Sequence, residues 1–362
     1  MRIVHTEASR GWGGQEIRVL EESAGMIARG HQVTLIAPRE AEIFRRAAER
    51  GIPAVALPIG RRGLRGVLAL RRWLKDHAAD VVNSHSSTDS WLAALALRAL
   101  QPAPPLVRTR HISAPIPDNI ATRWLYRRAT VHVVTTGERL RAQVIRETGI
   151  EADRVTSVPT GIDVARFVPG DRRAARQQTG LPQERKLIGI IATLRSWKGH
   201  RYLIEAFAKL ARPETGLVIV GDGPQREALH ELIDKLGLGE RVSMPGNQND
   251  VLPWLQAFDV FVLPSYANEG VPQALLQAML CGLPCVTTAV GSIGEIAQHE
   301  TTALLVEPRD AESLARALAR LLDEPQLGAK LAANALPRIR ADYSRERMLD
   351  RMEAIFRAVV HG

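Results

Sequence analysis

A carboxylate stands next to the expected start of a helix in residues 264–284 of the chain. Glu269 and Gly270 follow an apolar run at residues 260–263 that is typical of a buried strand, and apolar residues at helical spacing come after them. Unpaired N–H groups at a helix start attract anionic oxygens, and a carboxylate accepts hydrogen bonds from sugar hydroxyls. This combination indicates a polyol phosphate as the ligand.

Two cations follow another expected strand, at residues 187–192. Arg195 and Lys198 lie between this strand and the next helical pattern. A guanidinium forms paired hydrogen bonds to phosphate oxygens and an ammonium adds a point charge, so the two side chains suit a diphosphate. A pair of surface cations is the alternative, but their position at the carboxyl end of a strand favours the diphosphate clamp.

The first half of the chain also places polar or small residues at strand ends. His85 ends the run VVNSH and His111 ends VRTRH. One histidine at a strand end is often only a polar residue that meets solvent, whereas two on neighbouring strand ends indicate a site. Gly13 and Gly14 open a helical pattern after the first strand, and without Cβ atoms they let the backbone approach a phosphate or sugar closely.

These residues need a parallel sheet to bring them together. Short β-rich runs alternate with helical patterns, which is typical of a doubly wound α/β sheet with ligands outside the carboxyl ends of its strands. The strands expected in the first half are residues 2–8, 32–38, 54–59, 80–85, 106–111 and 131–136. A second series begins at residue 187, after a polar stretch at residues 170–186.

Length and composition fit this organisation. The chain has 362 residues, enough for two ordinary α/β domains. No run of about eighteen apolar residues occurs, so we expect no membrane-spanning helix. The first residues, MRIVHTEA, form a strand pattern and not a signal-peptide pattern, so we expect a cytosolic protein.

The net charge of +9 is concentrated in the first half. Residues 1–165 hold 24 Lys and Arg against 16 Asp and Glu, a difference of +8, whereas residues 166–362 hold 24 against 23. With few aromatic residues for base stacking, this surface suits an anionic partner and not nucleic acid.

Much of the basic charge lies in one amphipathic segment, residues 61–77. Five arginines and one lysine are interleaved there with apolar residues, and residues 123–128 add a second basic and aromatic cluster. Such a helix can lie on an anionic membrane surface, and this peripheral contact would suit a lipid-linked acceptor. A core-facing helix with a solvated basic face is the alternative.

Residues 264–284 resemble the donor-binding segment of the family 4 retaining glycosyltransferases. That segment has Glu-Gly, a helix with a second Glu eight positions after the first, and Gly-x-Pro. Glu269 matches the first acid, and Gln277 stands at the second position. The resemblance implies that Glu269 contacts hydroxyls of the transferred sugar and Gln277 the ribose of the nucleotide. The donor-binding residues implied in this segment also include Gly270, Val271, Pro272 and Gln273.

Other motifs extend the resemblance over nearly the whole chain. Lys198-Gly199 matches the Lys-Gly of the family, Thr193 stands where the family has Arg, and Arg195 could replace that Arg. The Gly-Asp-Gly-Pro turn contains Gly223, and the Gly-Gly-x-Glu loop corresponds to Gly13, Gly14 and Glu16. Residues 159–169 are similar to the signature Pro-Asn-Gly-Ile-Asp…Phe…Pro, with Thr160 in place of Asn. By resemblance, His111 reaches the donor sugar near the reacting centre and His85 lies at the mouth of the cleft.

The family implies the GT-B fold, two Rossmann-like domains with doubly wound parallel sheets that face each other across a cleft. The acceptor domain would be residues 1–168, with a final helix at about 344–362 packing back on it, and the donor domain would be residues 169–343. The activity implied is a retaining glycosyltransferase that uses a nucleotide-diphosphate sugar, with Glu269, Lys198, Arg195 and His111 as catalytic residues. No Asp-x-Asp motif ends a strand, so we expect neither a metal nor a cofactor.

The expected product is a cell-surface polysaccharide or lipopolysaccharide, made on a glycan or lipid-linked acceptor at the inner face of the membrane. Two alternatives share the fold. A nucleotide-sugar 2-epimerase would need acid and base carboxylates. Release of nucleoside diphosphate that depends on an acceptor would distinguish a transferase from this epimerase. A non-catalytic, membrane-associated module would bind a nucleotide sugar without turning it over, and Gln277 and Thr193 favour this alternative.

Overall fold

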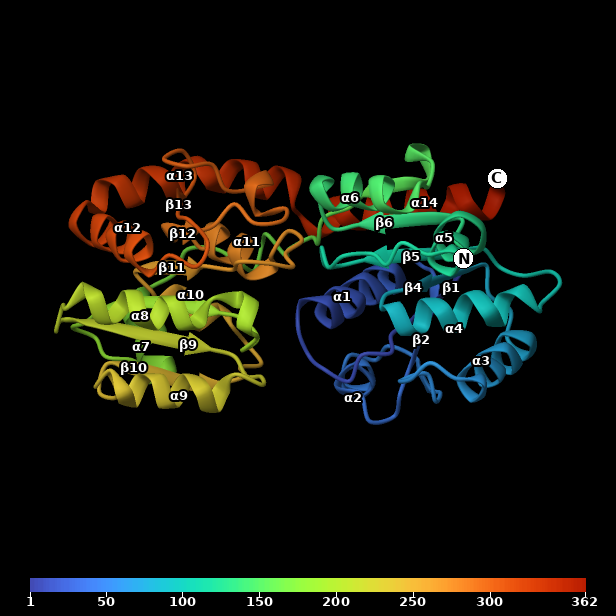
Figure 1. The fold of residues 1–362 in the computed structure, drawn as a ribbon, viewed down its shortest axis with the longest axis horizontal. Helices are drawn as coiled ribbons and strands as arrows, with labels where there is room; N and C mark the ends of the chain where they lie inside the picture. The colour runs from blue at the N-terminus through green and yellow to red at the C-terminus, as the bar shows by residue number, and fades with distance from the viewer. The chain divides into compact units, whose positions relative to one another are not determined.

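Ile162 marks the point where the chain passes from one structural unit to another. The computed structural model describes residues 1–362, which divide into unit 1 (Met1–Gly161 and Arg345–Gly362) and unit 2 (Ile162–Ser344) (Figure 1). Ile162 pairs with Ser344, and its N–H donates to the carbonyl of Tyr343 at 2.8 Å. This pairing holds residue 162 in unit 2, so the boundary lies earlier than the expected residue 168.

Unit 1 is built on a seven-stranded parallel sheet in the order β3-β2-β1-β4-β5-β6-β7. The strands are β1 (Arg2–Thr6), β2 (Gln32–Ala37), β3 (Ala54–Ala56), β4 (Val81–Ser84), β5 (Leu106–Arg110), β6 (His132–Thr135) and β7 (Val155–Ser157). The helices are α1 (Gly14–Ala28), α2 (Glu42–Glu49), α3 (Leu64–Asp76), α4 (Ser87–Arg98), α5 (Ile120–Trp124), the π-helical turn η1 (Leu125–Ala129), α6 (Glu138–Thr148), the 3₁₀ turn η2 (Ala152–Arg154) and α14 (Arg345–His361).

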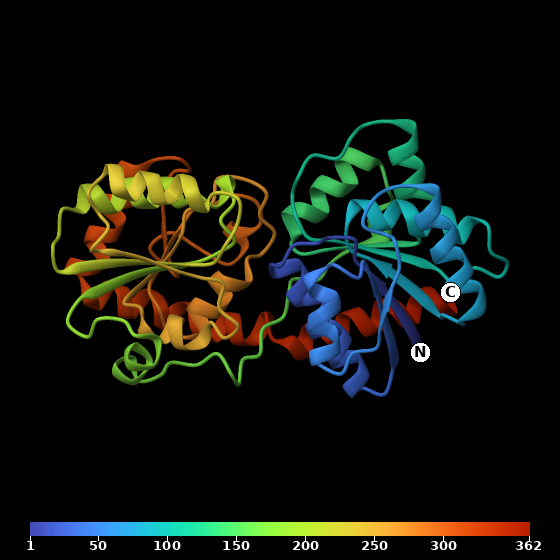
Figure 2. The ribbon, with the colours of Figure 1, turned by 90° about the horizontal axis from the view of Figure 1, so that it is seen from below.

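Helices cover both faces of this sheet (Figure 2). Because side chains alternate along a strand, Leu106 packs with Leu70 of α3 and Leu92 of α4, whereas Val107 packs on the opposite face with Met352 of α14. Both faces are therefore apolar, as expected for a parallel sheet.

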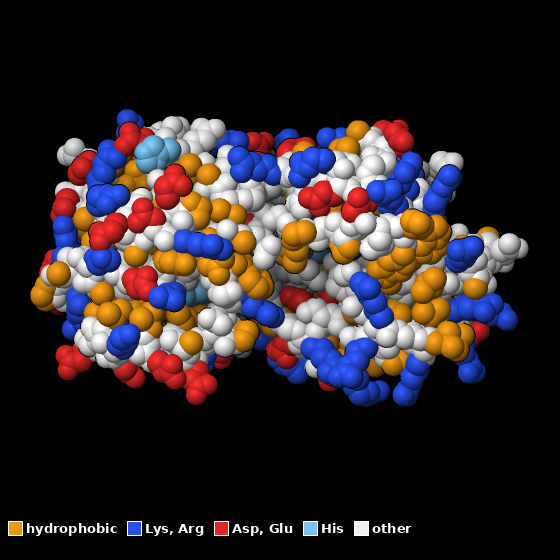
Figure 3. Space-filling view, viewed as in Figure 1, with side chains coloured by type: hydrophobic (Ala, Val, Ile, Leu, Met, Phe, Trp, Pro, Cys, Tyr) orange, Lys and Arg blue, Asp and Glu red, His pale blue; other side chains and the backbone are white.

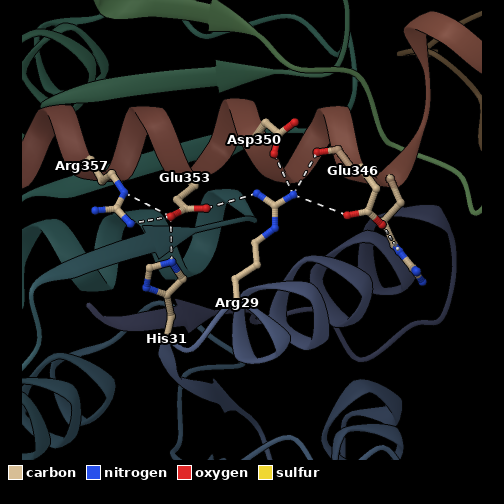
Figure 4. Close-up of polar contacts among 7 residues, drawn as sticks. Arg29, His31, Glu346, Asp350, Glu353 and Arg357 are labelled. Carbon is tan, nitrogen blue, oxygen red and sulfur yellow. Dashed lines mark hydrogen bonds and ion pairs between the residues drawn. The ribbon is translucent and has the colours of Figure 1, made fainter.

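The C-terminal helix α14 belongs to unit 1, and ion pairs and hydrogen bonds of charged residues hold it there (Figure 4). Arg29, the C-cap residue of α1, forms ion pairs with Glu346, Asp350 and Glu353 at 3.4, 2.7 and 3.1 Å. His31 lies 3.2 Å from the other oxygen of Glu353. These contacts fix the rotation of α14, so that its apolar face meets the sheet.

Unit 2 has a six-stranded parallel sheet in the order β10-β9-β8-β11-β12-β13. The strands are β8 (Lys186–Ile191), β9 (Thr215–Val220), β10 (Val242–Gly246), β11 (Val260–Leu263), β12 (Cys285–Thr287) and β13 (Leu304–Leu305). The helical elements are α7 (Arg172–Thr179), η3 (Ser196–Lys198), α8 (His200–Leu210), α9 (Arg226–Lys235), α10 (Leu252–Ala257), α11 (Gln273–Leu280), η4 (Ile293–Glu295), α12 (Ala311–Asp323) and α13 (Pro325–Asp342).

The basic segment at residues 61–77 forms α3, and Lys and Arg side chains gather over α2 and α3 on the face seen in Figure 3. Leu70 and Leu74 of α3 are buried, while Leu64 and Leu68 are 72% and 51% exposed. In the second basic cluster Tyr126 is only 1% exposed, so its ring faces inward. No helix of the structure is both long and apolar enough to cross a bilayer.

Candidate active site

Lys198 and Glu269 meet at the carboxyl ends of two neighbouring strands of unit 2. Nζ of Lys198 lies 2.6 Å from Oε1 of Glu269, and the hydroxyl of Ser265 donates to the same oxygen at 2.6 Å. Glu269 is only 4% exposed. Oε2 of Glu269 makes no hydrogen bond within the protein and is not enclosed, so it remains available to accept one from a ligand hydroxyl.

Close contact between two loops produces this pairing. β8 and β11 are adjacent in the sheet, so the loop with Lys198 and the loop with Glu269 leave the same edge side by side. The N–H of Tyr266 donates to the carbonyl of Trp197 at 2.8 Å. Gly199 has a φ of +77°, and a Cβ there would lie 2.1 Å from the carbonyl oxygen of Pro264. Only glycine fits this contact without a shift of the backbone.

A second glycine supports the backbone of Glu269 from the other side. A Cβ at Gly291 would lie 2.1 Å from the carbonyl oxygen of Glu269, and Gly291 has a φ of +57°. Asn268, which precedes Glu269, is itself in the left-handed region with a φ of +59°. Glu269 is therefore held by a strained residue on one side and a glycine contact on the other.

The expected donor-binding residues after Glu269 lead into α11. Pro272 is the N-cap residue and not a first helical residue, because its ψ of 125° is extended and α11 begins at Gln273. Gly270 and Val271 are buried, and Gln277 lies half-buried one turn into the helix. The start of α11 thus follows directly from the loop that holds Glu269.

The remaining expected residues of unit 2 lie in the turns around Leu194. Thr193 is half-buried, and Arg195 is exposed with its guanidinium carbon 5.6 Å from the ring centroid of Trp197. Gly223 has a φ of +154°, and a Cβ there would lie 2.9 Å from the carbonyl oxygen of Leu194. Gly223 therefore lets the turn after β9 pack closely on the turn after β8. Arg195 makes no contact with Glu269, unlike Lys198.

In unit 1 the expected His85 and His111 are neighbours, and a third imidazole extends the row. Nδ1 of His85 lies 3.1 Å from Nε2 of His111, and Nε2 of His85 lies 2.9 Å from Nδ1 of His5. Nε2 of His5 in turn lies 3.9 Å from Oε1 of Glu22. The row thus runs from half-buried His111 to the fully buried carboxylate of Glu22.

Burial keeps these imidazoles neutral. Burial, followed by the charge of Arg18, lowers the pKa of His5 to about 3. The pKa values of His85 and His111 also fall well below the usual range because of burial. Each contact in a row of neutral imidazoles needs one N–H and one lone pair, so all members share one direction. With the proton of His5 on Nε2, toward Glu22, Nδ1 of His111 is left as a hydrogen-bond acceptor.

Gly13, Gly14 and Glu16 lie at the start of α1, beside the carboxyl end of β1. Gly13 is the N-cap residue of α1, with extended backbone, and Glu16 is buried in the first turn. Burial and the nearby carboxylates of Asp89 and Glu16 raise the pKa of Glu7 well above its ordinary value. The carboxyl end of the sheet in unit 1 therefore carries a group of acidic residues, Glu7, Glu16 and Asp89, in addition to the row of histidines.

Comparisons with known sequences agree with the motifs. Residues 171–337 match the model of glycosyl transferases group 1, and residues 12–166 match that of glycosyltransferase family 4. The chain belongs to the family 4, group 1 glycosyltransferases.

Two curated relatives of this family are informative. A D-inositol 3-phosphate glycosyltransferase of Rhodococcus jostii is 34% identical over 236 residues, which cover 60% of this chain and 52% of the relative. The UDP-Gal:alpha-D-GlcNAc-diphosphoundecaprenol alpha-1,3-galactosyltransferase of Escherichia coli is 27% identical over 281 residues, which cover 74% of this chain and 72% of the relative. The match spans about half the length of this Rhodococcus jostii relative and of D-inositol 3-phosphate glycosyltransferase 2 of Catenulispora acidiphila.

Solved structures of glycosyltransferases share the fold over the whole chain. A glycosyltransferase of Rickettsia africae ESF-5 has a TM-score of 0.88 at 19% identity and covers 100% of this chain and 99% of its own. HepE of Anabaena, in complex with UDP-glucose, has a TM-score of 0.88 at 21% identity, with 99% and 100% covered. This family 4 chain therefore has the GT-B fold, with a Rossmann-like parallel sheet in each unit.

Sequence reasoning about this glycosyltransferase family member missed several groups that contact the expected residues. Ser265 donates a hydrogen bond to Glu269, and its position two residues after the strand β11 was the available signal. His5 was missed although it is a polar residue that directly follows the apolar pair Ile3 and Val4 in β1. Glu22 and Arg18 lie four residues apart in α1, a spacing that could have indicated a buried ion pair.

Proposed function

We propose that this chain transfers a glycosyl group from a nucleoside-diphosphate sugar to a hydroxyl group of a glycan or lipid-linked acceptor. The observation that carries the proposal is the 2.6 Å contact between Lys198 and Glu269 at adjoining strand ends, in a chain of the family 4 glycosyltransferases. It combines a cation suited to phosphate with a carboxylate suited to hydroxyl groups, as a nucleotide sugar requires.

The chemistry asks unit 2 to stabilise the negative charge that develops on the leaving diphosphate. Lys198 has ammonium protons beyond the one directed at Glu269, and it donates these to phosphate oxygens. Arg195, exposed three residues before it, adds a second cation, and the first N–H groups of α11 add partial positive charge. These fixed donors therefore stabilise the negative charge of the diphosphate as it leaves.

Glu269 orients the sugar in this proposal and does not attack it. Its Oε1 already accepts from Lys198 and Ser265, which leaves Oε2 to accept from a sugar hydroxyl. We therefore expect retention of the anomeric configuration by same-face attack, in which an oxygen of the donor phosphate takes the proton of the acceptor hydroxyl. We also propose that the reaction needs no metal, because Lys198 and Arg195 supply the cationic charge.

Turnover with a panel of nucleotide sugars tests the activity. The expected result is release of nucleoside diphosphate only when an acceptor such as a lipid-linked diphosphate sugar is present. The anomeric coupling constant of the product, measured by NMR, reports retention, and full activity in EDTA reports metal independence. An epimerised nucleotide sugar without acceptor would indicate the 2-epimerase, and binding without any turnover would indicate the non-catalytic module.

We propose further that the chain works at the inner face of a membrane, in the synthesis of a cell-surface polysaccharide or lipopolysaccharide. The support is α3, where Leu64 and Leu68 point into solvent among exposed arginines. An anionic bilayer would cover the leucines and attract the cations. The alternative, a solvated basic face, leaves these two leucines without a role.

Sedimentation with vesicles at low salt tests this contact. Wild-type protein should sediment with phosphatidylglycerol vesicles, and replacement of Leu64 and Leu68 by Ser together with Arg65, Arg71 and Arg72 by Gln should prevent it. Arg139, an exposed cation of the same unit on α6, provides the control as Arg139→Gln. Equal sedimentation of all three proteins would rule out α3 as the contact.

A further inference from the structure

Arg108 is a buried cation of unit 1 that forms no direct ion pair within the protein. It lies on β5 opposite Ser84 of β4 and is 4% exposed. Nε and Nη1 of its guanidinium are enclosed without a hydrogen-bond partner. Burying an ionised group costs several kcal/mol unless partners replace its water. The structure therefore leaves a large desolvation cost at Arg108 that a bound anion would offset.

A buried arginine with a structural role has hydrogen-bond acceptors for its N–H groups, as another arginine of this chain illustrates. Arg176 in unit 2 is equally buried, but it forms an ion pair with Asp259 at 2.7 Å and donates to the carbonyls of Ala257 and Gln183. Arg108 has no such set of acceptors. Asp89, the carboxylate whose charge acts on Arg108, accepts instead from the Thr6 hydroxyl and the His85 N–H.

Tyr126 holds Arg108 and a second arginine in fixed positions. The guanidinium carbon of Arg108 lies 4.4 Å from the ring centroid of Tyr126. Nη1 of Arg110 donates to the hydroxyl of the same tyrosine at 3.2 Å and Nη2 donates to the carbonyl of Ala114, while Nε of Arg110 is enclosed without a partner. Arg108 and Arg110 are two residues apart on β5, so their side chains leave the same face of the sheet. Tyr126 thus orients two guanidinium groups at the carboxyl end of one strand.

A third arginine approaches from the loop before α3. Nη2 of Arg62 donates to the hydroxyl of Ser87 at 2.8 Å, at the start of α4. Burial lowers the pKa of Arg108; the charges of Tyr126 and Asp89 oppose this shift, and the charges of Arg110 and Arg62 add to it. Arg108 and these two cations repel one another, and an anion among them would offset the repulsion.

We propose that Arg108, Arg110 and Arg62 form an oxyanion site in unit 1 that binds a phosphate group. Nη2 of Arg108 has no protein partner and is not enclosed, so it is where the anion first makes contact. Planar guanidinium groups bind phosphate oxygens in pairs, which suits a phosphate ester or a diphosphate. The site itself depends only on this geometry. That the phosphate belongs to the acceptor rests on the proposed function.

Thermal unfolding in the presence of inorganic phosphate and pyrophosphate tests the site. Because Lys198 of unit 2 also attracts phosphate, the measurement uses the Lys198→Ala protein as its background. We expect pyrophosphate to raise the Tm of this protein, because a ligand that binds only the folded state stabilises it. Adding Arg108→Met should abolish the rise and increase the Tm in phosphate-free buffer, because the unpaired buried charge is gone.

Arg98→Gln in the same background is the matched control. Arg98 is an exposed arginine of α4 that stacks on Trp124, so its loss removes one charge and one cation–π contact from the same unit. We expect the pyrophosphate effect to persist in this protein. An equal rise in Tm with Met at position 108, or no rise in the background protein, would overturn the proposal. Far-UV circular dichroism checks that each variant is folded.

Two arms of the experiment distinguish the source of the phosphate. One measures the affinity for a water-soluble sugar phosphate, and the other measures the affinity for vesicles that contain a polyprenyl diphosphate. A loss of at least tenfold on Arg108→Met in either arm identifies that source, and no loss in both arms contradicts the site. Binding of UDP, measured with Lys198 intact, should be unchanged by Arg108→Met. If UDP does not bind the protein with Lys198 intact while pyrophosphate still raises the Tm as expected, this result counts against the proposed function and not against this site.

Discussion

Nζ of Lys198 and Oε1 of Glu269 lie 2.6 Å apart although 71 residues separate them in the sequence. The contact joins the loops after two adjacent strands, β8 and β11. We predict that Lys198→Ala lowers kcat by about a hundredfold to a thousandfold, the usual effect of losing one donor to a developing oxyanion. Lys209→Ala, which removes an exposed lysine paired with Glu312 in the same unit, should leave the rate unchanged. A near-normal rate for Lys198→Ala would remove it from the site.

Glu269→Gln should impair the orientation of the sugar while leaving the fold intact. The amide is the same size as the carboxylate but presents one acceptor oxygen, and its NH₂ group cannot accept from a sugar hydroxyl or from Lys198. We expect a large loss of kcat with a Tm close to that of the wild type, measured by acceptor-dependent release of nucleoside diphosphate and by thermal unfolding. Turnover within a few fold of the wild type would contradict the role given to Glu269.

The loop contact at Gly199 makes a prediction about stability. Gly199→Ala should destabilise unit 2 by roughly 2–5 kcal/mol, because a Cβ would strain a left-handed residue and press on the carbonyl of Pro264. Gly237→Ala is the control, since Gly237 has a φ of +66° with nothing within 4 Å of a Cβ. The control should cost only about 1 kcal/mol in urea unfolding. Equal costs would show that the contact with Pro264 contributes nothing.

The buried His200 predicts how stability changes with pH. Burial and then the charge of Lys198 lower its pKa from 6.5 to about 3, so the unfolded chain binds a proton that the folded chain does not. The stability of unit 2 should therefore rise with pH between about 3 and 6.5 and be complete above that range. Urea unfolding at pH 5 and pH 7 measures this slope. His200→Gln should flatten it, whereas replacement of exposed His230 by Gln should leave it unchanged.

The imidazole row predicts that His85 positions His111. His85→Phe keeps a ring in place but leaves Nε2 of His111 and Nδ1 of His5 without their partner. We expect kcat to fall with KM little changed, and the ¹⁵N shifts of His111 to show a mixture of tautomers in place of one. His132→Gln on β6, outside the row, is the control. Unaltered His111 shifts in the His85→Phe protein would contradict the relay of tautomers.

The sequence predicted the two parallel sheets because strand and helix patterns alternate clearly. It also predicted that Lys198 and Glu269 follow strands, but not that they touch, because β8 and β11 become neighbours only through the strand order of the sheet. The same limit applies to His5, whose imidazole meets His85 because β1 lies beside β4.

Arg108 shows a second kind of limit. In the run VRTRH it reads as one more basic residue near a strand end, and nothing local distinguishes it from Arg110. Its burial depends on Tyr126, which the sequence placed in a surface cluster of basic and aromatic residues. Whether Tyr126 faces the sheet or solvent depends on the side-chain directions in the short helical segments α5 and η1. These segments have too few residues for a periodic pattern to predict those directions.

The return of α14 to unit 1 sets the order in which the chain can mature during synthesis. Unit 2 is one continuous segment, so all of its residues are translated before the helix α14 that completes unit 1. Until then the sheet of unit 1 exposes the apolar groove that Met352 and Phe356 will fill. The first part of this protein to be translated is thus the last to be completed, and a nascent chain stalled before residue 345 would be a client for chaperones that bind exposed apolar surface.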